Sequence, residues 1–157
     1  MTSAKRSPGA KSRPATRAKS RLTASDYQTL ASFRYGVRRY LAFAEANARS
    51  VGLTSQQHQA LLAIKVWTAH KSMTVGDLAA ELLIRHHSTV ELVGRLEKAG
   101  LVRRDADVED RRKVFVSLAA AGEELLAALS VGNLRELQLV APIFAGLLHQ
   151  METLEAG

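Results

Sequence analysis

The outward side of one predicted helix, which ends near Gly100, carries the side chains best suited to contact another molecule. With Val93 at the centre of the buried side, a turn of about 100° per residue places these polar side chains outside: His87, Ser88, Glu91, Arg95 and Lys98. They offer hydrogen-bond donors, acceptors and positive charge at the spacing needed to read base edges in a DNA major groove. The alternative is a solvated helix surface with an ordinary Glu91–Arg95 pair.

The segments on either side of this helix favour the DNA interpretation. Residues 75–82 have apolar side chains at the i, i+3, i+4 and i+7 positions of one helix face, and Thr74 and Asp77 before and within them have capping-box spacing. After Gly100, β-prone runs at 101–104 and 114–118 enclose a mostly polar loop. Helix, turn, helix and hairpin together predict a winged helix-turn-helix.

Long helices are predicted before and after this winged unit, which covers about residues 54–118. Residues 25–49 form the first, with Ser25 and Gln28 at capping-box spacing, and Thr54 with Gln57 caps the next helix. Residues 120–155 are helical again, and Pro142 is expected to break or restart the helix because proline lacks a backbone N–H. The predicted class is therefore mainly α with a small β-hairpin wing.

The apolar stripes of the two terminal helical segments exceed what one winged unit can cover. Such leftover apolar surface is typical of a protein that binds another chain. We therefore expect residues 25–49 and 120–155 to be dimerisation helices. Packing of these stripes against the core of their own subunit is the alternative.

Residues 1–24 differ in composition from the rest of the chain. They carry seven Lys or Arg and no Asp or Glu, whereas the other 133 residues carry 15 basic and 15 acidic side chains. The net charge of +7 therefore lies entirely in this segment. Pro8, Gly9 and Pro14 interrupt it and no apolar stripe is present, so we expect a disordered basic arm and not a secretory signal.

Several function classes find no support in the sequence. The chain has no cysteine, and its five histidines form no H-x-x-x-H or H-x-x-H pair on a predicted helix, so no metal or cofactor is expected. Neither a G-x-S-x-G sequence nor a phosphate-binding glycine loop occurs, which speaks against an enzyme. No run of about 18 apolar residues exists, so we expect no membrane span and a cytoplasmic protein.

Two sequence stretches carry a resemblance to a known family. L-V-G-R-L-E-K-A-G-L-V-R-R (92–104), followed by D-R-R-K-V-F-V-S-L-A-A-A-G (110–122), resembles the MarR family of bacterial transcription regulators. Leu53–Leu62 is similar to the second helix of that family, and the likeness extends over about residues 26–155. The chain departs from the family at Ala119, where Thr is usual, and in the turn at Leu83 and Arg85, where Gly and a Ser or Thr cap are common.

The resemblance implies a function and a set of contacts. It implies a homodimer with interlocked terminal helices, which would bind a near-palindromic operator in double-stranded DNA. It also implies that a wing arginine enters the minor groove while an aspartate braces it. With the helix residues, and with Thr89, which falls on the buried side, the candidate DNA contacts are His87, Ser88, Thr89, Glu91, Arg95, Lys98, Asp110, Arg111 and Arg112.

An effector pocket between the dimer helices and the winged unit is a further implication of the resemblance. The aromatic and basic residues that could line it are Tyr27, Phe33, Tyr35, Tyr40, Trp67, Arg38 and Arg39. The leading hypothesis is thus a dimeric, sequence-specific transcription regulator, and a repressor that a small molecule relieves. A winged-helix protein-interaction module and an architectural DNA-binding protein with little sequence preference are the alternatives.

Overall fold

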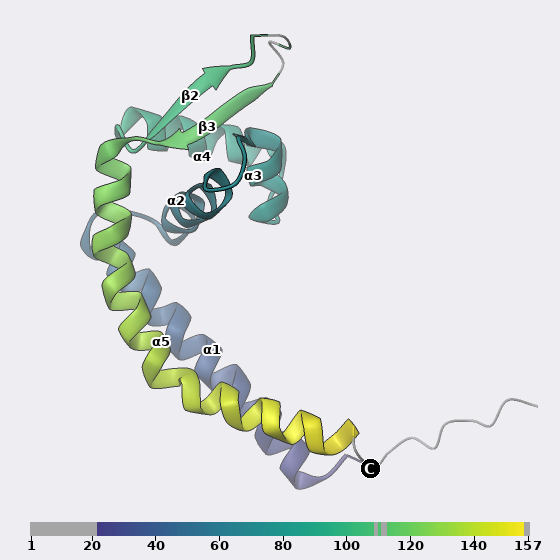
Figure 1. The fold of residues 1–157 in the computed structure, drawn as a ribbon. Helices are drawn as coiled ribbons and strands as arrows, with labels where there is room; N and C mark the ends of the chain where they lie inside the picture. Colours follow the sequence, from purple (N-terminus) through teal and green to yellow (C-terminus); the bar gives the residue numbers. More distant parts are fainter. Residues whose placement is uncertain (1–21, 109, 111–112, 156–157) are drawn as a thin grey trace, which may run out of the picture.

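Helices dominate the part of the chain that the computed structural model describes, residues 22–108, 110 and 113–155, and a small sheet lies among them (Figure 1). In chain order the elements are α1 (Ala24–Ser50), α2 (Ser55–Thr68), β1 (Met73–Thr74), α3 (Val75–Glu81), α4 (His86–Lys98), β2 (Val102–Ala106), β3 (Val114–Leu118) and α5 (Ala120–Glu155). The predicted class, mainly helical with a β-hairpin wing, is confirmed. We call α2 to β3 the winged unit.

The sheet is antiparallel in the order β1-β3-β2. Val102 of β2 lies opposite Leu118 of β3, and Met73 of β1 lies opposite Val116 on the other edge of β3. The two-residue strand β1 was not predicted, because it is too short to show an alternating pattern. The largest fully buried side chains of the winged unit come from all its helices and from β1 and β3: Leu61, Ile64, Met73, Leu78, Leu92, Leu96 and Val116.

Capping boxes begin the first three helices. Those at Thr54 and Thr74 are confirmed, but α1 starts earlier than predicted: Thr23 is the cap, and Asp26, not Gln28, completes the box. The Thr23 N–H donates to Asp26 Oδ2 at 2.6 Å. A carboxylate accepts such a bond more strongly than an amide and also suits the positive helix end. Backbone and side-chain hydrogen bonds from Thr23 lower the pKa of Asp26.

The two long helices α1 and α5 run side by side away from the winged unit (Figure 1). The expected break at Pro142 was wrong, since α5 continues through it to Glu155. Packing on α1 just after the proline accounts for this: the Phe144 ring meets Phe33 edge-on with centroids 5.7 Å apart. Gly36 of α1 leaves room for Ile143, whose Cγ2 lies 3.3 Å from the Cβ that any other residue would place there. These contacts hold the helical course although one backbone hydrogen bond is lost.

The turn between α3 and α4 departs from the usual family pattern at Leu83 and Arg85, as the sequence indicated. Leu83 adopts a left-handed backbone with φ 55°, a conformation that favours glycine, and its side chain is almost fully exposed. Arg85 is the N-cap of α4 and makes no side-chain cap hydrogen bond. The turn is therefore formed without the local stabilisation that a glycine and a hydroxyl cap would provide.

Leu83→Gly is expected to raise the free energy of unfolding by about 0.5–1 kcal/mol, because it removes left-handed strain and loses no buried contact. Leu83→Ala is the matched control, since it also removes the exposed side chain but keeps the Cβ that causes the strain. Urea unfolding of both variants measures the difference. Equal stability of the glycine and alanine variants would contradict the strain at this position.

Candidate nucleic-acid interface

Helix α4 is held in the winged unit by four buried side chains, Thr89, Leu92, Val93 and Leu96. They recur at steps of three, one and three residues and pack α4 onto α3, α2 and β2. This burial leaves the opposite side of α4 turned outward. Among the predicted contacts, His87, Glu91, Arg95 and Lys98 are exposed there and Ser88 is half-buried.

The exposures of two side chains of α4 contradict what was predicted for them, Thr89 as a DNA contact and Val90 as a buried residue. Thr89 is fully buried, and its hydroxyl donates to the Arg85 carbonyl at 3.2 Å, so we remove it from the candidate DNA contacts. Val90, which a turn of about 100° per residue from Val93 would place on the buried side, is exposed, whereas Leu92, which would flank that side, is buried. The buried side of α4 is thus turned toward Leu92, because β2 as well as α3 packs against this helix.

The charges on the outer side of α4 are not neutralised within that side. Arg95 forms no ion pair with any residue that the structure describes, so the Glu91–Arg95 pair of the alternative interpretation is not formed. The acidic residue next along the helix, Glu97, pairs instead with Arg104 of β2. Arg95 therefore has its guanidinium donors free of protein carboxylates, as binding to a base edge requires.

A groove of about 570 Å³ separates α4 from the wing. Three basic side chains line it, His86 from α4, Arg104 from β2 and Lys113 just before β3, and Asp77 of α3 is the acidic residue among them. No sequence pattern groups these residues, because the hairpin brings them together from separate segments. Lys113 supplies positive charge beside the outer side of α4, where the phosphates of a bound duplex would lie, whereas Arg104 is paired with Glu97.

The loop of the wing is closed by hydrogen bonds on both sides of its tip. The Asp107 N–H donates to the Lys113 carbonyl at 3.0 Å, and the Lys113 N–H donates to the Asp110 carbonyl at 2.8 Å. Asp110 also donates its N–H to Asp107 Oδ1 at 3.2 Å. Arg111 and Arg112 lie outside the described residues, so their contact with the minor groove, and the bracing role of Asp110, stay predictions.

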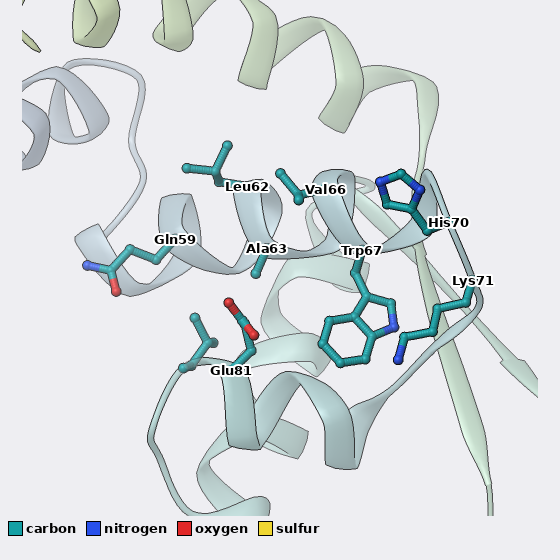
Figure 2. Close-up of a pocket in the computed structure, with 9 residues that line it drawn as sticks. Gln59, Leu62, Ala63, Val66, Trp67, His70, Lys71 and Glu81 are labelled. Atoms are coloured by element: carbon teal, nitrogen blue, oxygen red, sulfur yellow. The ribbon is translucent and has the colours of Figure 1, made fainter.

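A second cavity, of about 530 Å³, lies between α2 and α3 (Figure 2). Its apolar lining includes Leu62, Val66 and Trp67, and Figure 2 shows Ala63 and Trp67 on the side of α2 that faces Glu81. The Lys71 amine stands 4.1 Å from the centroid of the Trp67 ring. The buried indole N–H of Trp67 has no hydrogen-bond partner among the described residues, which leaves a donor for an acceptor group of a ligand.

The other residues that the resemblance suggested for an effector pocket do not line this cavity. The exposed Tyr27 and Tyr35 are on α1, and Phe33 packs on Phe144. Arg39 Nε donates to the buried Glu136 of α5 at 2.8 Å, so it joins the two long helices. Of that set, Trp67 is the residue that the structure brings to a cavity wall.

Among the described residues, no three or more His, Cys, Asp or Glu side chains come together in a group that could hold a metal ion. In the same part of the chain, no helix is both long and apolar enough to cross a membrane.

Sequence comparisons agree with a winged helix-turn-helix regulator. Residues 51–113 match the sequence model of the MarR family. Over 84 residues the chain is 34% identical to the transcriptional activatory protein BadR of Rhodopseudomonas palustris, covering 54% of this chain and 48% of BadR. Over 38 residues it is 53% identical to the transcriptional regulator HosA of Escherichia coli, covering 24% of this chain and 28% of HosA. The matched part thus spans about half the length of BadR and less of HosA.

Solved structures share the fold over most of their length. A mutant of Staphylococcus aureus MepR bound to an oligodeoxyribonucleotide has a TM-score of 0.62 and 23% identity, covering 82% of this chain and 97% of that chain. Wild-type MarR of E. coli, in its apo form, has a TM-score of 0.64 and 17% identity, covering 78% of this chain and 92% of that chain. The chain therefore has the winged helix-turn-helix fold of these structures. Residues 51–113 are thus similar to the MarR family, whose sequence model they match.

Proposed function

We propose that this chain is a homodimeric regulator that binds double-stranded DNA in a sequence-specific way, with α4 in the major groove. The observation that carries the proposal is the outer side of α4, where Arg95 and Lys98 are exposed and Arg95 is unpaired among the described residues. Ser88 and Glu91 add an acceptor and donor pattern to this positive charge. The basic groove between α4 and the wing supports phosphate contacts beside the base contacts.

The long helices support the dimer. Large apolar side chains stay exposed along both of them, and many align on one side of each helix: Tyr27, Leu30 and Leu41 on α1, and Val131, Leu134, Leu137 and Leu148 on α5. A second copy of the chain would cover these rows through a two-fold axis. Two copies of α4 would then meet two half-sites, so the operator should be near-palindromic.

The cavity between α2 and α3 supports control by a small molecule. Helix α3 packs directly on α4, so a ligand that wedges between α2 and α3 would shift α4 from its position on DNA. We therefore propose a repressor that releases its operator when a small molecule binds. A transcription assay with the operator upstream of a reporter decides between repression and activation.

Selection of bound fragments from a genomic DNA library is the most direct test of the function. We expect a near-palindromic motif whose half-sites are separated by about one helical turn. Recovery of fragments with no shared motif would instead favour an architectural DNA-binding protein. Failure to bind any DNA would favour a protein-interaction module.

Arg95→Ala is expected to weaken operator binding by about 1–3 kcal/mol per subunit and to relax the preference at one base position of each half-site. Binding assays, followed by a repeated selection, measure both effects. Arg135→Ala removes an exposed arginine from α5 and is the control, with unchanged motif and affinity expected. If the Arg95 variant recovers the same motif with the same affinity, this side of α4 does not read the DNA.

A further inference from the structure

Three polar side chains meet where the long helices join the winged unit. Asn47 comes from α1, His58 from α2 and Asn133 from α5, and the last two are buried. Asn47 Nδ2 lies 3.0 Å from Asn133 Oδ1, and Asn133 Nδ2 lies 3.3 Å from His58 Nε2. A chain of hydrogen bonds therefore connects all three helices at one place.

The hydrogen bonds fix which group donates at each step. Asn47 donates its amide N–H to Asn133 Oδ1 and to the Leu129 carbonyl, each at 3.0 Å. The Asn133 oxygen is thus used as an acceptor, and its amide nitrogen faces His58. Since that nitrogen can only donate, His58 Nε2 must accept, which requires the neutral imidazole with its proton on Nδ1.

A glycine of α5 leaves the space that this cluster occupies. At Gly132 of α5, any other residue would place its Cβ 3.3 Å from Asn47 Nδ2, so the glycine leaves the space through which Asn47 reaches α5. A short link, residues 51–54, joins α1 to α2. The cluster spans the same junction, where α2 packs against both α1 and α5 (Figure 1).

Three ion pairs are formed by charged groups on the helices around His58. Arg39 of α1 binds Glu136 of α5, Glu45 binds Arg49 along α1, and Lys65 of α2 binds Glu123 of α5. Burial alone lowers the pKa of His58, with no contribution from a nearby charge. The imidazole therefore has Asn133 as its hydrogen-bond partner at Nε2 and no carboxylate there to stabilise a second proton.

We propose that Asn47, His58 and Asn133 form a positioning cluster that holds the winged unit at the angle needed for operator binding, and that a second proton on His58 releases it. A protonated His58 would turn an N–H toward the N–H groups of Asn133. Turning the Asn133 amide over would give His58 an acceptor but would break the bond from Asn47. Once His58 is charged, at least one hydrogen-bonding group of the cluster has no partner within it.

The direction of the pH effect follows from the lowered pKa. The folded state with the cluster closed binds fewer protons than the released state below the ordinary histidine pKa of 6.5. The stabilisation is thus complete above that pH and is lost as the pH falls toward the lowered pKa. DNA binding, on which this inference relies through the proposed function, should weaken in mild acid.

His58→Gln and Asn133→Asp test the proposal in opposite directions. The glutamine of H58Q does not titrate, and its amide oxygen can accept from Asn133 in place of Nε2. The carboxylate of N133D can accept from Asn47 and from a protonated His58 together, so it should raise the pKa of His58. The NMR resonance of the His58 ring, assigned by its absence from H58Q, reports the pKa in wild type and in N133D.

Affinity for the selected DNA duplex is measured at pH 7.5 and 5.5. Compared with H58Q, wild type should lose up to about tenfold more affinity per pH unit of acidification for each histidine. N133D should lose less affinity than wild type. The three proteins differ only at position 58 or 133, so the comparison with H58Q isolates the contribution of His58. An equal acid response in wild type and H58Q would overturn the proposal.

Two further readouts separate this inference from the function on which it rests. Unfolding temperatures of wild type, H58Q and N133D at both pH values test the cluster without DNA. On acidification, the unfolding temperature of wild type should fall more than that of H58Q, and that of N133D should fall less than that of wild type. If no duplex binds at any pH, the proposed function fails, whereas a lowered His58 pKa in wild type and a raised one in N133D would still support the cluster. A His58 pKa that does not rise in N133D would overturn the cluster even if DNA binds.

Discussion

Gly122→Ala is expected to lower the free energy of unfolding by about 3 kcal/mol, because the new methyl group has no space. A Cβ at this buried position of α5 would lie 2.1 Å from the Leu101 carbonyl oxygen and 3.0 Å from its carbon. These are backbone atoms, and the same carbonyl accepts the Ala119 N–H at 3.0 Å. The first turn of α5 would have to move away from the start of the wing.

Gly146→Ala is the matched control for this prediction. Gly146 belongs to the same helix, and nothing lies within 4 Å of the Cβ that alanine would add. This variant should gain about 0.5–1 kcal/mol, since glycine is a poor helix former. Urea unfolding should therefore shift in opposite directions for the two variants. Stabilisation by both would show that α5 and the wing are not in contact at Gly122.

Gly122 also shows what the sequence could and could not predict. The glycine stands at the end of the stretch 110–122 that carries the family resemblance, and its position in the motif was evident. The reason for it was not evident, because Leu101 is distant in the sequence. Local signals such as the capping boxes at Thr54 and Thr74 predicted helix starts correctly, since both partners lie within four residues.

Properties that depend on contacts between distant segments were predicted poorly. Helical periodicity placed Val90 on the buried side of α4, but Val90 is exposed and Leu92 is buried. The rule for proline predicted a break at Pro142, but α5 continues through it and packs on α1 there through Phe144 and Phe33. The cluster around His58 likewise joins three helices that no local pattern relates.

Some candidate DNA contacts likewise follow from a local pattern, whereas others depend on contacts between distant segments. The outward side of α4 follows from periodicity within one helix, so His87, Glu91 and Arg95 were predicted as exposed and are exposed. The basic groove of His86, Arg104 and Lys113 depends on how the hairpin folds back on α4, and the sequence did not reveal it. Their contacts with DNA stay a proposal.

Leu134→Glu is expected to raise the dissociation constant of the proposed dimer by about 100-fold or more. Leu134 is 60% exposed on α5, in line with Leu137 and Leu148. Burial of one leucine contributes about 1.5–3 kcal/mol, and a two-fold interface contains each residue twice. A glutamate at this site would remove that burial and add two charges that must lose water. Sedimentation at several protein concentrations measures the change.

Leu139→Glu provides the control for the position of the interface. Leu139 is 61% exposed on the same helix, but five residues turn it by about 140° from Leu134. Its variant should remain a dimer, so a loss of dimer in the Leu134 variant alone assigns the interface to one side of α5. DNA binding should follow the dimer, because a monomer presents a single α4 to a two-half-site operator. If Leu134→Glu sediments as the wild type does and binds the operator as tightly, the apolar row of α5 is not where the two chains meet.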